Sequence, residues 1–147
     1  MFLLIGILYD RYHSRLLYYY GGLVHMMPVY AALLLIFTMA NIALPGTSSF
    51  VGEFLLLLGI YKTNVISAIV GALGVILCGA YSLWLYNRII FGNLKTSFIV
   101  RFKDINFLEF SILLPLLFFV IFMGVYPSFF SNFIHLSVCN LSLVTMY

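Results

Sequence analysis

Charged side chains are scarce in this chain of 147 residues, since only 7% of its residues are charged and 65% are hydrophobic. An ordinary soluble domain has about 25% charged and about 45–50% apolar residues. Seven Lys and Arg with four Asp and Glu cannot cover the surface of a water-soluble globule or form a nucleic-acid interface. The composition therefore excludes a soluble fold, a disordered region and a nucleic-acid partner. It indicates an integral membrane protein whose surroundings are a lipid bilayer.

Motifs for covalent or metal chemistry are also missing. The chain has two cysteines, Cys78 and Cys139, far apart and without a CxxC pair or a histidine at ligand spacing. This pattern favours neither a metal site nor a disulfide framework. We also find no glycine-rich phosphate loop, no nucleophile–base pair and no cofactor motif. We therefore expect no catalytic residue, metal or cofactor in this chain, and proton handling is the chemistry left for it.

The apolar stretches predict an all-α membrane protein, a transmembrane helix bundle with one discontinuous helix. A helix needs about 20 apolar residues to cross a bilayer, and the polar clusters mark where each crossing ends. The tail carries no charge, so we expect it to be interfacial or to lie against a partner. Residues 1–147 then form a single membrane domain with the following parts: 1–9, the end of a truncated helix; 23–61, a broken transmembrane helix with its break at 45–49; 65–87 and 107–126, transmembrane helices; and 127–147, the C-terminal tail.

The break within residues 23–61 follows from both length and charge. As one straight helix these residues would be about 58 Å long, nearly twice a hydrocarbon core of about 30 Å. Proline and glycine at 45–49 interrupt the stretch locally. The basic loops at 10–20 and 88–106 should share one side of the membrane under the positive-inside rule. Because 65–87 crosses once, 23–61 must also count as one crossing, as a broken helix or a helix with a re-entrant half.

Glu53 is the one acid placed well inside an apolar stretch. An isolated acid at mid-membrane costs on the order of 3 kcal/mol, so it normally faces protein or water and marks an ion or proton path. The N-terminus of the second half-helix would direct a positive partial charge towards it. Discontinuous helices with a charge beside the break recur at transport sites. The alternative is a structural acid, hydrogen-bonded to a neighbouring helix or lying at the interface.

Five polar residues of the same region are further candidates for a proton pathway. Thr47, Ser48 and Ser49 could contact water in the same cavity, or could cap the second half-helix. Lys62 lies about 13 Å further along the helix, too far for direct pairing. It suits an interface anchor, with a proton relay as the weaker alternative. His25 lies near the boundary of the first half, where proton entry is again the weaker alternative.

Four stretches of the sequence resemble subunit 4 of respiratory complex I, the proton-pumping NADH:ubiquinone oxidoreductase, and most of all its mitochondrial versions. The resemblance extends to about Pro127. Its motifs are Leu8-Tyr9-Asp10-Arg11 with Ser14-Arg15; Gly22-Leu23 with Met26-Met27-Pro28; Leu44-Pro45-Gly46-Thr47-Ser48-Ser49-Phe50-Val51-Gly52-Glu53-Phe54; and Ala80-Tyr81-Ser82-Leu83-Trp84-Leu85-Tyr86-Asn87-Arg88.

The resemblance implies an antiporter-like subunit whose second broken helix carries the motif seen here. The glutamate of that helix is the terminal proton site of the family, and Glu53 matches it. The chain would then supply the exit half of a proton channel in an enzyme complex, with no redox chemistry of its own. Flavin and iron–sulfur clusters would lie elsewhere in the complex. The expected location is the mitochondrial inner membrane, with the loops at 10–20 and 88–106 on the matrix side.

The chain departs from that family in size, because the glutamate and lysine of the first half-channel and the central lysine have no counterpart in it. We expect a separate polypeptide to carry the N-terminal helices of the subunit, or else this chain to be a fragment. Other complex I membrane-arm subunits are the remaining expected partners. Two alternatives stay open: a subunit of a multi-subunit Na⁺/H⁺ antiporter or membrane-bound hydrogenase, and a purely structural membrane-arm subunit.

Overall fold

The computed structural model describes residues 1–93 and 103–145, and every regular element in these ranges is a helix. Three of the α-helices are longer than α2 and α3, and two short 3₁₀ turns precede α2. In chain order the elements are α1 (Phe2–Tyr12), η1 (Leu17–Tyr19), η2 (Leu23–His25), α2 (Pro28–Asn41), α3 (Ser48–Thr63), α4 (Val65–Ile90), α5 (Phe107–Val125) and α6 (Pro127–Thr145).

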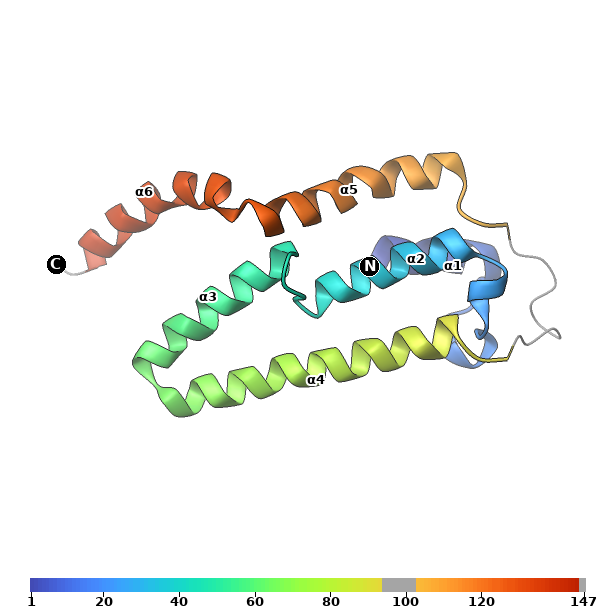
Figure 1. The fold of residues 1–147 in the computed structure, drawn as a ribbon, viewed down its shortest axis with the longest axis horizontal. Helices are drawn as coiled ribbons and strands as arrows, with labels where there is room; N and C mark the ends of the chain where they lie inside the picture. Colours follow the sequence, from blue (N-terminus) through green and yellow to red (C-terminus); the bar gives the residue numbers. More distant parts are fainter. Residues whose placement is uncertain (94–102, 146–147) are drawn as a thin grey trace.

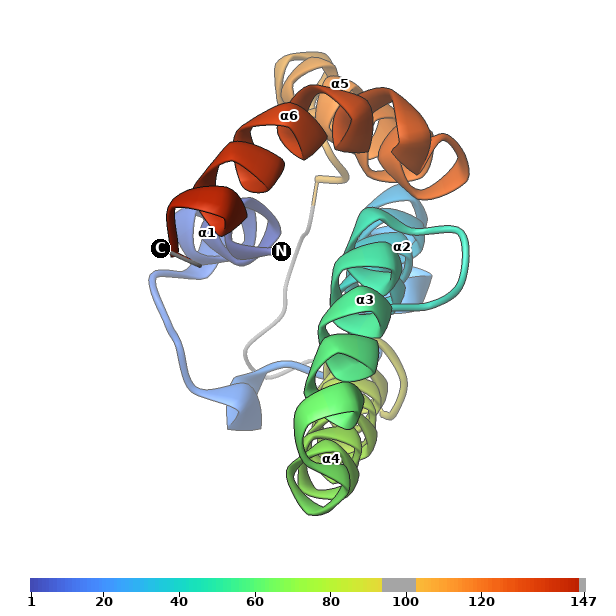
Figure 2. The same ribbon diagram turned by 90° about the vertical axis from the view of Figure 1, so that its left-hand side faces the viewer.

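The helices run roughly along one direction, so the molecule is elongated (Figure 1). Helix α4 packs along α2 and α3 on one side, and α5 packs against α3 on the other. Helix α6 continues from α5 and extends away from the remaining helices (Figure 1). The end-on view in Figure 2 shows α2, α3 and α4 in one column with α5 across its upper end. The two half-helices α2 and α3 therefore lie between α4 and α5.

The helix bounds differ from the expected ones at several points. Residues 23–27 contain the turn η2, and the α-helix begins at Pro28. Proline fits the first helical position and disfavours helical backbone in the residue before it. Met27 accordingly has φ −135° and ψ 71°. The interruption between α2 and α3 covers residues 42–47 rather than 45–49.

The second half-helix and the third span are longer than expected. Helix α3 begins at Ser48 and reaches Thr63, and α4 continues to Ile90. Asn64 alone separates them, and its side-chain oxygen accepts a hydrogen bond from the backbone amide of Ile66 at 3.0 Å. This is an N-cap of α4, and it lets the chain reverse direction within one residue.

Two further expectations concern the basic loop at 88–106 and the tail at 127–147. Lys95 and Arg101, two of the cations assigned to the loop at 88–106, lie outside the described residues. The tail forms α6 as far as Thr145. Among the side chains of α6 that the structure describes, Phe129, Phe133, Ile134, Val138 and Leu141 are exposed, so these residues bury little surface against the rest of the chain.

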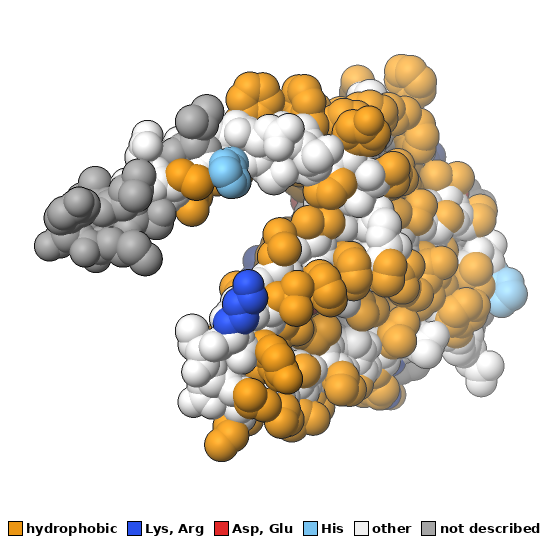
Figure 3. Space-filling model, turned by 60° about the vertical axis from the view of Figure 1, so that its left-hand side comes forward, with side chains coloured by type: hydrophobic (Ala, Val, Ile, Leu, Met, Phe, Trp, Pro, Cys, Tyr) orange, Lys and Arg blue, Asp and Glu red, His pale blue; other side chains and the backbone are white. Residues whose placement is uncertain are grey.

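Helices α4 and α5 are both long and apolar enough to cross a membrane. Little of either is buried inside the molecule, since 11% and 6% of their most apolar windows are covered by the described chain. Figure 3 shows hydrophobic side chains over most of the visible face. An apolar surface of this extent suits contact with lipid or with other membrane helices.

The buried core lies at the end of the molecule where α1, α2, the end of α4 and α5 meet. In contrast, α3 has no buried residue. The hydroxyl of Tyr30 in this core donates to the backbone oxygen of Leu4 at 3.2 Å, which joins α2 to α1. The largest fully buried hydrophobic side chains are Leu4, Leu23, Met27, Tyr30, Ile90 and Leu113.

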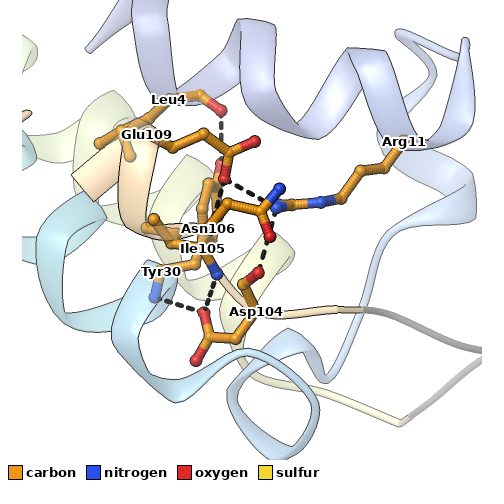
Figure 4. Close-up of polar contacts among 7 residues, drawn as sticks. All are labelled: Leu4, Arg11, Tyr30, Asp104, Ile105, Asn106 and Glu109. Carbon is orange, nitrogen blue, oxygen red and sulfur yellow. Dashed lines mark hydrogen bonds and ion pairs between the residues drawn. The ribbon is translucent and has the colours of Figure 1, made fainter. Parts of the chain in front are cut away.

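Three charged side chains form a polar cluster at this same end (Figure 4). Arg11 comes from the end of α1, Asp104 from the segment before α5, and Glu109 from the first turn of α5. Arg11 and Glu109 form an ion pair with an N–O distance of 2.8 Å. We call these three residues the polar cluster, and they connect elements that are distant in the sequence.

Candidate functional site

The first half-helix, α2, ends in a hydrogen-bonded reversal. The amide of Leu44 donates to the carbonyl of Met39, and the amide of Ala43 donates to the carbonyl of Ala40, at 3.1 and 3.2 Å. This pairing is the Schellman motif, which closes a helix with a left-handed residue. Ala43 occupies that position with φ 61° and is buried. The motif usually holds glycine, so the helix ends here with strained backbone.

A tight turn follows immediately and leads into α3. The amide of Thr47 donates to the carbonyl of Leu44 at 3.0 Å, which closes a four-residue turn. Pro45 takes the second position, where its fixed φ is suitable, and Gly46 takes the third with φ 96°. This is the pattern of a type II turn, whose third residue needs positive φ. The Pro-Gly pair therefore determines the geometry of the break, as its sequence indicates.

Two neighbouring helices approach the break through glycine. A Cβ atom at Gly124 of α5 would clash with the backbone oxygen of Gly46. A Cβ at Gly79 of α4 would lie 3.4 Å from the Ile42 side chain. Gly124 thus lets the backbone of α5 touch the backbone of the break, a contact that any larger residue would obstruct.

The N-terminus of α3 has no side-chain cap. The hydroxyl of Thr47 donates to the carbonyl of Leu44 at 2.8 Å, so it supports the turn and does not cap the helix. Ser48 and Ser49 lie in the first turn of α3 and are half-buried. These hydroxyls were expected to contact water or to cap α3, and the structure shows no side-chain cap at the N-cap residue, Thr47. The first amides of α3 consequently keep their positive partial charge available.

Glu53 lies in the second turn of α3 and is half-buried. It shares its helix face with Leu57 and Ile60, which are also half-buried and follow it at the helical spacing of four and seven residues. Leu57 faces Gly71 of α4, since a Cβ there would lie 3.2 Å from the Leu57 side chain. Within the described residues the Glu53 carboxylate has no hydrogen bond or ion pair. It remains available to groups outside this chain.

The structure does not bring the two more distant candidates to Glu53. Lys62 is exposed in the last turn of α3, and nine residues of helix separate it from Glu53, about 13 Å. His25 is exposed in η2, which precedes α2. The length of α2, about 21 Å for its 14 residues, separates it from the break. Neither side chain belongs to the immediate surroundings of the acid.

A polar group beside the break was not expected from the sequence. The sulfur of Cys78 lies 3.7 Å from the backbone oxygen of Asn41, the last residue of α2. The same sulfur lies 3.5 Å from the hydroxyl of Tyr81. The thiol therefore satisfies a carbonyl that the helix end leaves free. Asn41, an amide directly before the break, was the available signal in the sequence.

Comparison with known proteins identifies the family to which this architecture belongs. Residues 1–78, more than half of the chain, match the family described as "NADH:quinone oxidoreductase/Mrp antiporter, TM". The chain belongs to this family. The matched segment contains the first four α-helices in part or whole, including the break and Glu53.

Individual relatives are similar over nearly the whole chain. "NADH-ubiquinone oxidoreductase chain 4" of Marchantia polymorpha is 54% identical over 141 residues, which cover 96% of this chain and 28% of that protein. "NADH-quinone oxidoreductase subunit M" of Rhodobacter capsulatus is 48% identical over the same share of each. The chain thus spans about 28% of the length of these relatives. The resemblance to subunit 4 of complex I is confirmed.

A solved structure is similar as well. A chain of "Respiratory complex I from Thermus thermophilus with bound NADH" superposes with a TM-score of 0.82 and 36% sequence identity. The superposition covers 88% of this chain and 27% of that chain. Together with the family match it confirms the expected fold class, an all-α membrane protein with a discontinuous helix.

Proposed function

We propose that this chain forms part of a proton-translocating membrane-arm subunit of NADH:ubiquinone oxidoreductase, complex I. In this proposal it supplies the exit half of an antiporter-like proton channel. The observation that carries the proposal is Glu53, an acid without a partner in the described chain, placed two turns after a helix break in an apolar segment. The similarity to proteins named as chain 4 or subunit M of this enzyme supports it.

The geometry of the break supports proton binding at this acid. Uncapped amides at the start of α3 direct a positive partial charge towards the region. In the proposed mechanism the Glu53 carboxyl group takes up and releases a proton as the electrostatic potential along the membrane arm changes. A central relay in the partner polypeptide delivers the proton, and release follows on the opposite side of the membrane.

The other pathway candidates take lesser roles in this proposal. Ser48 and Ser49 order water near the carboxyl group. Thr47 maintains the turn through its hydrogen bond to Leu44. Lys62 at the end of α3 and His25 before α2 act chiefly at the membrane boundaries, because the structure holds both far from Glu53.

The proposed setting is the mitochondrial inner membrane, in line with the chain 4 relatives of plants and algae. The partners would be other membrane-arm subunits and a polypeptide with the remaining helices of the subunit. This chain would carry out no electron transfer. Flavin and iron–sulfur clusters in other subunits would supply the redox energy.

The proposal is tested with a Glu53→Gln variant in the assembled complex. We expect normal assembly and NADH:quinone electron transfer, with fewer protons moved per NADH oxidised. Asp10→Asn, which neutralises an exposed carboxylate, is the matched control and should translocate protons normally. Wild-type stoichiometry in the assembled Glu53→Gln complex would refute the transport role and favour a structural one. Sodium-dependent proton exchange without co-purifying redox subunits would favour the antiporter alternative.

A further inference from the structure

The polar cluster attaches the start of α5 to the end of α1. One nitrogen of the Arg11 guanidinium group, Nη2, donates to Glu109 Oε2 at 2.8 Å and to the backbone oxygen of Asp104 at 3.1 Å (Figure 4). The same Glu109 oxygen accepts the amide of Asn106 at 2.8 Å, which completes the capping box of α5. Glu109 therefore serves both its own helix and the contact to α1.

Asp104 also fixes the start of α2. Its two carboxylate oxygens accept the backbone amides of Val29 and Tyr30, at 3.1 and 3.2 Å. The N-cap residue of α2, Met27, has no side chain able to make these bonds. A residue 75 positions away in the sequence thus caps the first half-helix, and its negative charge suits the helix N-terminus. The start of α2 and the start of α5 are held at one place.

The other end of α5 touches the break. At Gly124 the helix comes so close to Gly46 and Thr47 that an added Cβ would clash with backbone atoms of both residues. From Glu109 to Gly124 the helix extends about 22 Å. From Val29 to Asn41 the first half-helix extends about 18 Å, and the break follows directly. Helix α5 runs in the same direction as α2 (Figure 1). The segment before α5 holds the beginning of α2 through Asp104, and the end of α5 touches the break.

We propose that α5 is a strut that sets the position of the break. Arg11, Asp104 and Glu109 are positioning residues at one end, and Gly124 is the contact at the other. Displacement of either end moves the turn at 44–47 and with it the start of α3. Insofar as the proposed function holds, the strut also positions Glu53, because that residue follows in the second turn of the same helix.

The contrast between helices supports this inference. Helix α3 has no buried residue of its own, and it packs against α4 and α5 through side chains that stay partly or fully exposed. The buried core lies around α1, α2 and the start of α5. The break joins α3 to the half of the molecule that contains the core, and α5 contacts the break there through backbone atoms.

The test uses the complete complex in its membrane, with two readouts. One is the labelling rate of a cysteine introduced by Ser49→Cys, by a membrane-permeant maleimide, in a chain with Cys78→Ala and Cys139→Ala. The other is the number of protons translocated per NADH oxidised, in a chain without these three changes. The strut variants are Asp104→Asn, Glu109→Gln and Gly124→Ala. The control is Asp10→Asn, beside Arg11 but exposed.

We expect each strut variant to change the labelling rate several-fold and the control to leave it unchanged. Effects of distant, independent sites combine multiplicatively on a rate. If α5 connects them, Asp104→Asn combined with Gly124→Ala should change the rate by less than the product of the two single effects. An unchanged labelling rate in all assembled strut variants, or a strictly multiplicative double variant, would overturn the inference. Should Gly124→Ala prevent assembly, Asp104→Asn combined with Glu109→Gln replaces it, with a change in labelling still required.

The labelling result also separates this inference from the proposed function. Altered labelling at position 49 supports the strut even if Glu53→Gln translocates protons normally. In that case the strut positions the break, and the proton role of Glu53 is refuted. If Glu53→Gln lowers the proton stoichiometry and the strut variants leave labelling unchanged, the strut is refuted and the proton role stands. A purely structural role for the polar cluster would lower the amount of complex without changing labelling in the complex that assembles.

Discussion

Removal of one partner of the Arg11–Glu109 ion pair should lower the stability of the protein more than removal of both partners. The two side chains are 16% and 28% exposed, so both are largely withdrawn from solvent. Glu109→Gln keeps a hydrogen-bond acceptor but leaves the guanidinium charge without a counter-charge. A second guanidinium nitrogen, Nη1, is already buried without a partner within the described residues. From the range for charged hydrogen bonds we expect a cost of about 2 kcal/mol.

The double variant Arg11→Met with Glu109→Gln removes both charges of the half-buried pair and keeps most of the side-chain volume. Paired charges replaced by apolar residues of similar size often leave stability unchanged. We therefore expect the double variant to regain most of the roughly 2 kcal/mol lost in the single variant. The local opening free energy reports this directly, because the amide of Asn106 donates to Glu109.

Hydrogen exchange followed by mass spectrometry of the complex gives the required measurement. Each 1.4 kcal/mol is about a tenfold change in an equilibrium constant, so exchange around Asn106 should accelerate about 30-fold in Glu109→Gln. The double variant should lie close to wild type, as should the control Asp10→Asn. Unchanged exchange in Glu109→Gln, or a double variant that exchanges faster than the single one, would refute the reasoning.

Two further predictions concern local backbone geometry. Gly46→Ala should destabilise the break by about 1 kcal/mol through its positive φ alone, because an added Cβ has open space around it. Gly52→Ala, also in open space but within α3, should instead stabilise the protein by about 0.5–1 kcal/mol. The rates of thermal inactivation of the two variants test this difference. Asn64→Ala should cost about 1 kcal/mol by removing the cap of α4. Asn64→Asp should preserve most of that stability, and equal losses in both variants would show that the cap is unimportant.

The parts of the site that could be predicted from sequence are those with local causes. Pro45 and Gly46 interrupt an apolar stretch, and the turn they form depends on their own backbone preferences. Glu53 is recognisable because ionisable groups are rare in such a stretch. The start of α2 at Pro28 has an equally local cause, although the apolar pattern alone predicts that the span begins at residue 23. The sequence predicts Ser48 and Ser49 within the break, whereas they already belong to α3.

The contacts that fix the site in space were not predictable in the same way. Asp104 caps a helix that begins 75 residues earlier, and no local pattern relates it to Val29. Gly124 matters because α5 passes close to the backbone of Gly46 and Thr47. From sequence alone, a single glycine near a helix end has several explanations. Glu109 is an acid in the first turn of its own helix, but its pairing with Arg11 depends on where α1 lies. Tertiary neighbours, which local sequence does not reveal, decide all three.

The single-residue connection at Asn64 has a consequence for the rotational phase of the helices. Successive residues of an α-helix turn by about 100° around its axis. With one residue between α3 and α4, the phase of α4 follows directly from that of α3. One inserted residue would turn Gly71 away from Leu57 and Gly79 away from Ile42, without altering any of these side chains. The number of residues between the break and Gly79 therefore determines which side chains of α3 and α4 face each other, just as the identities of these residues do.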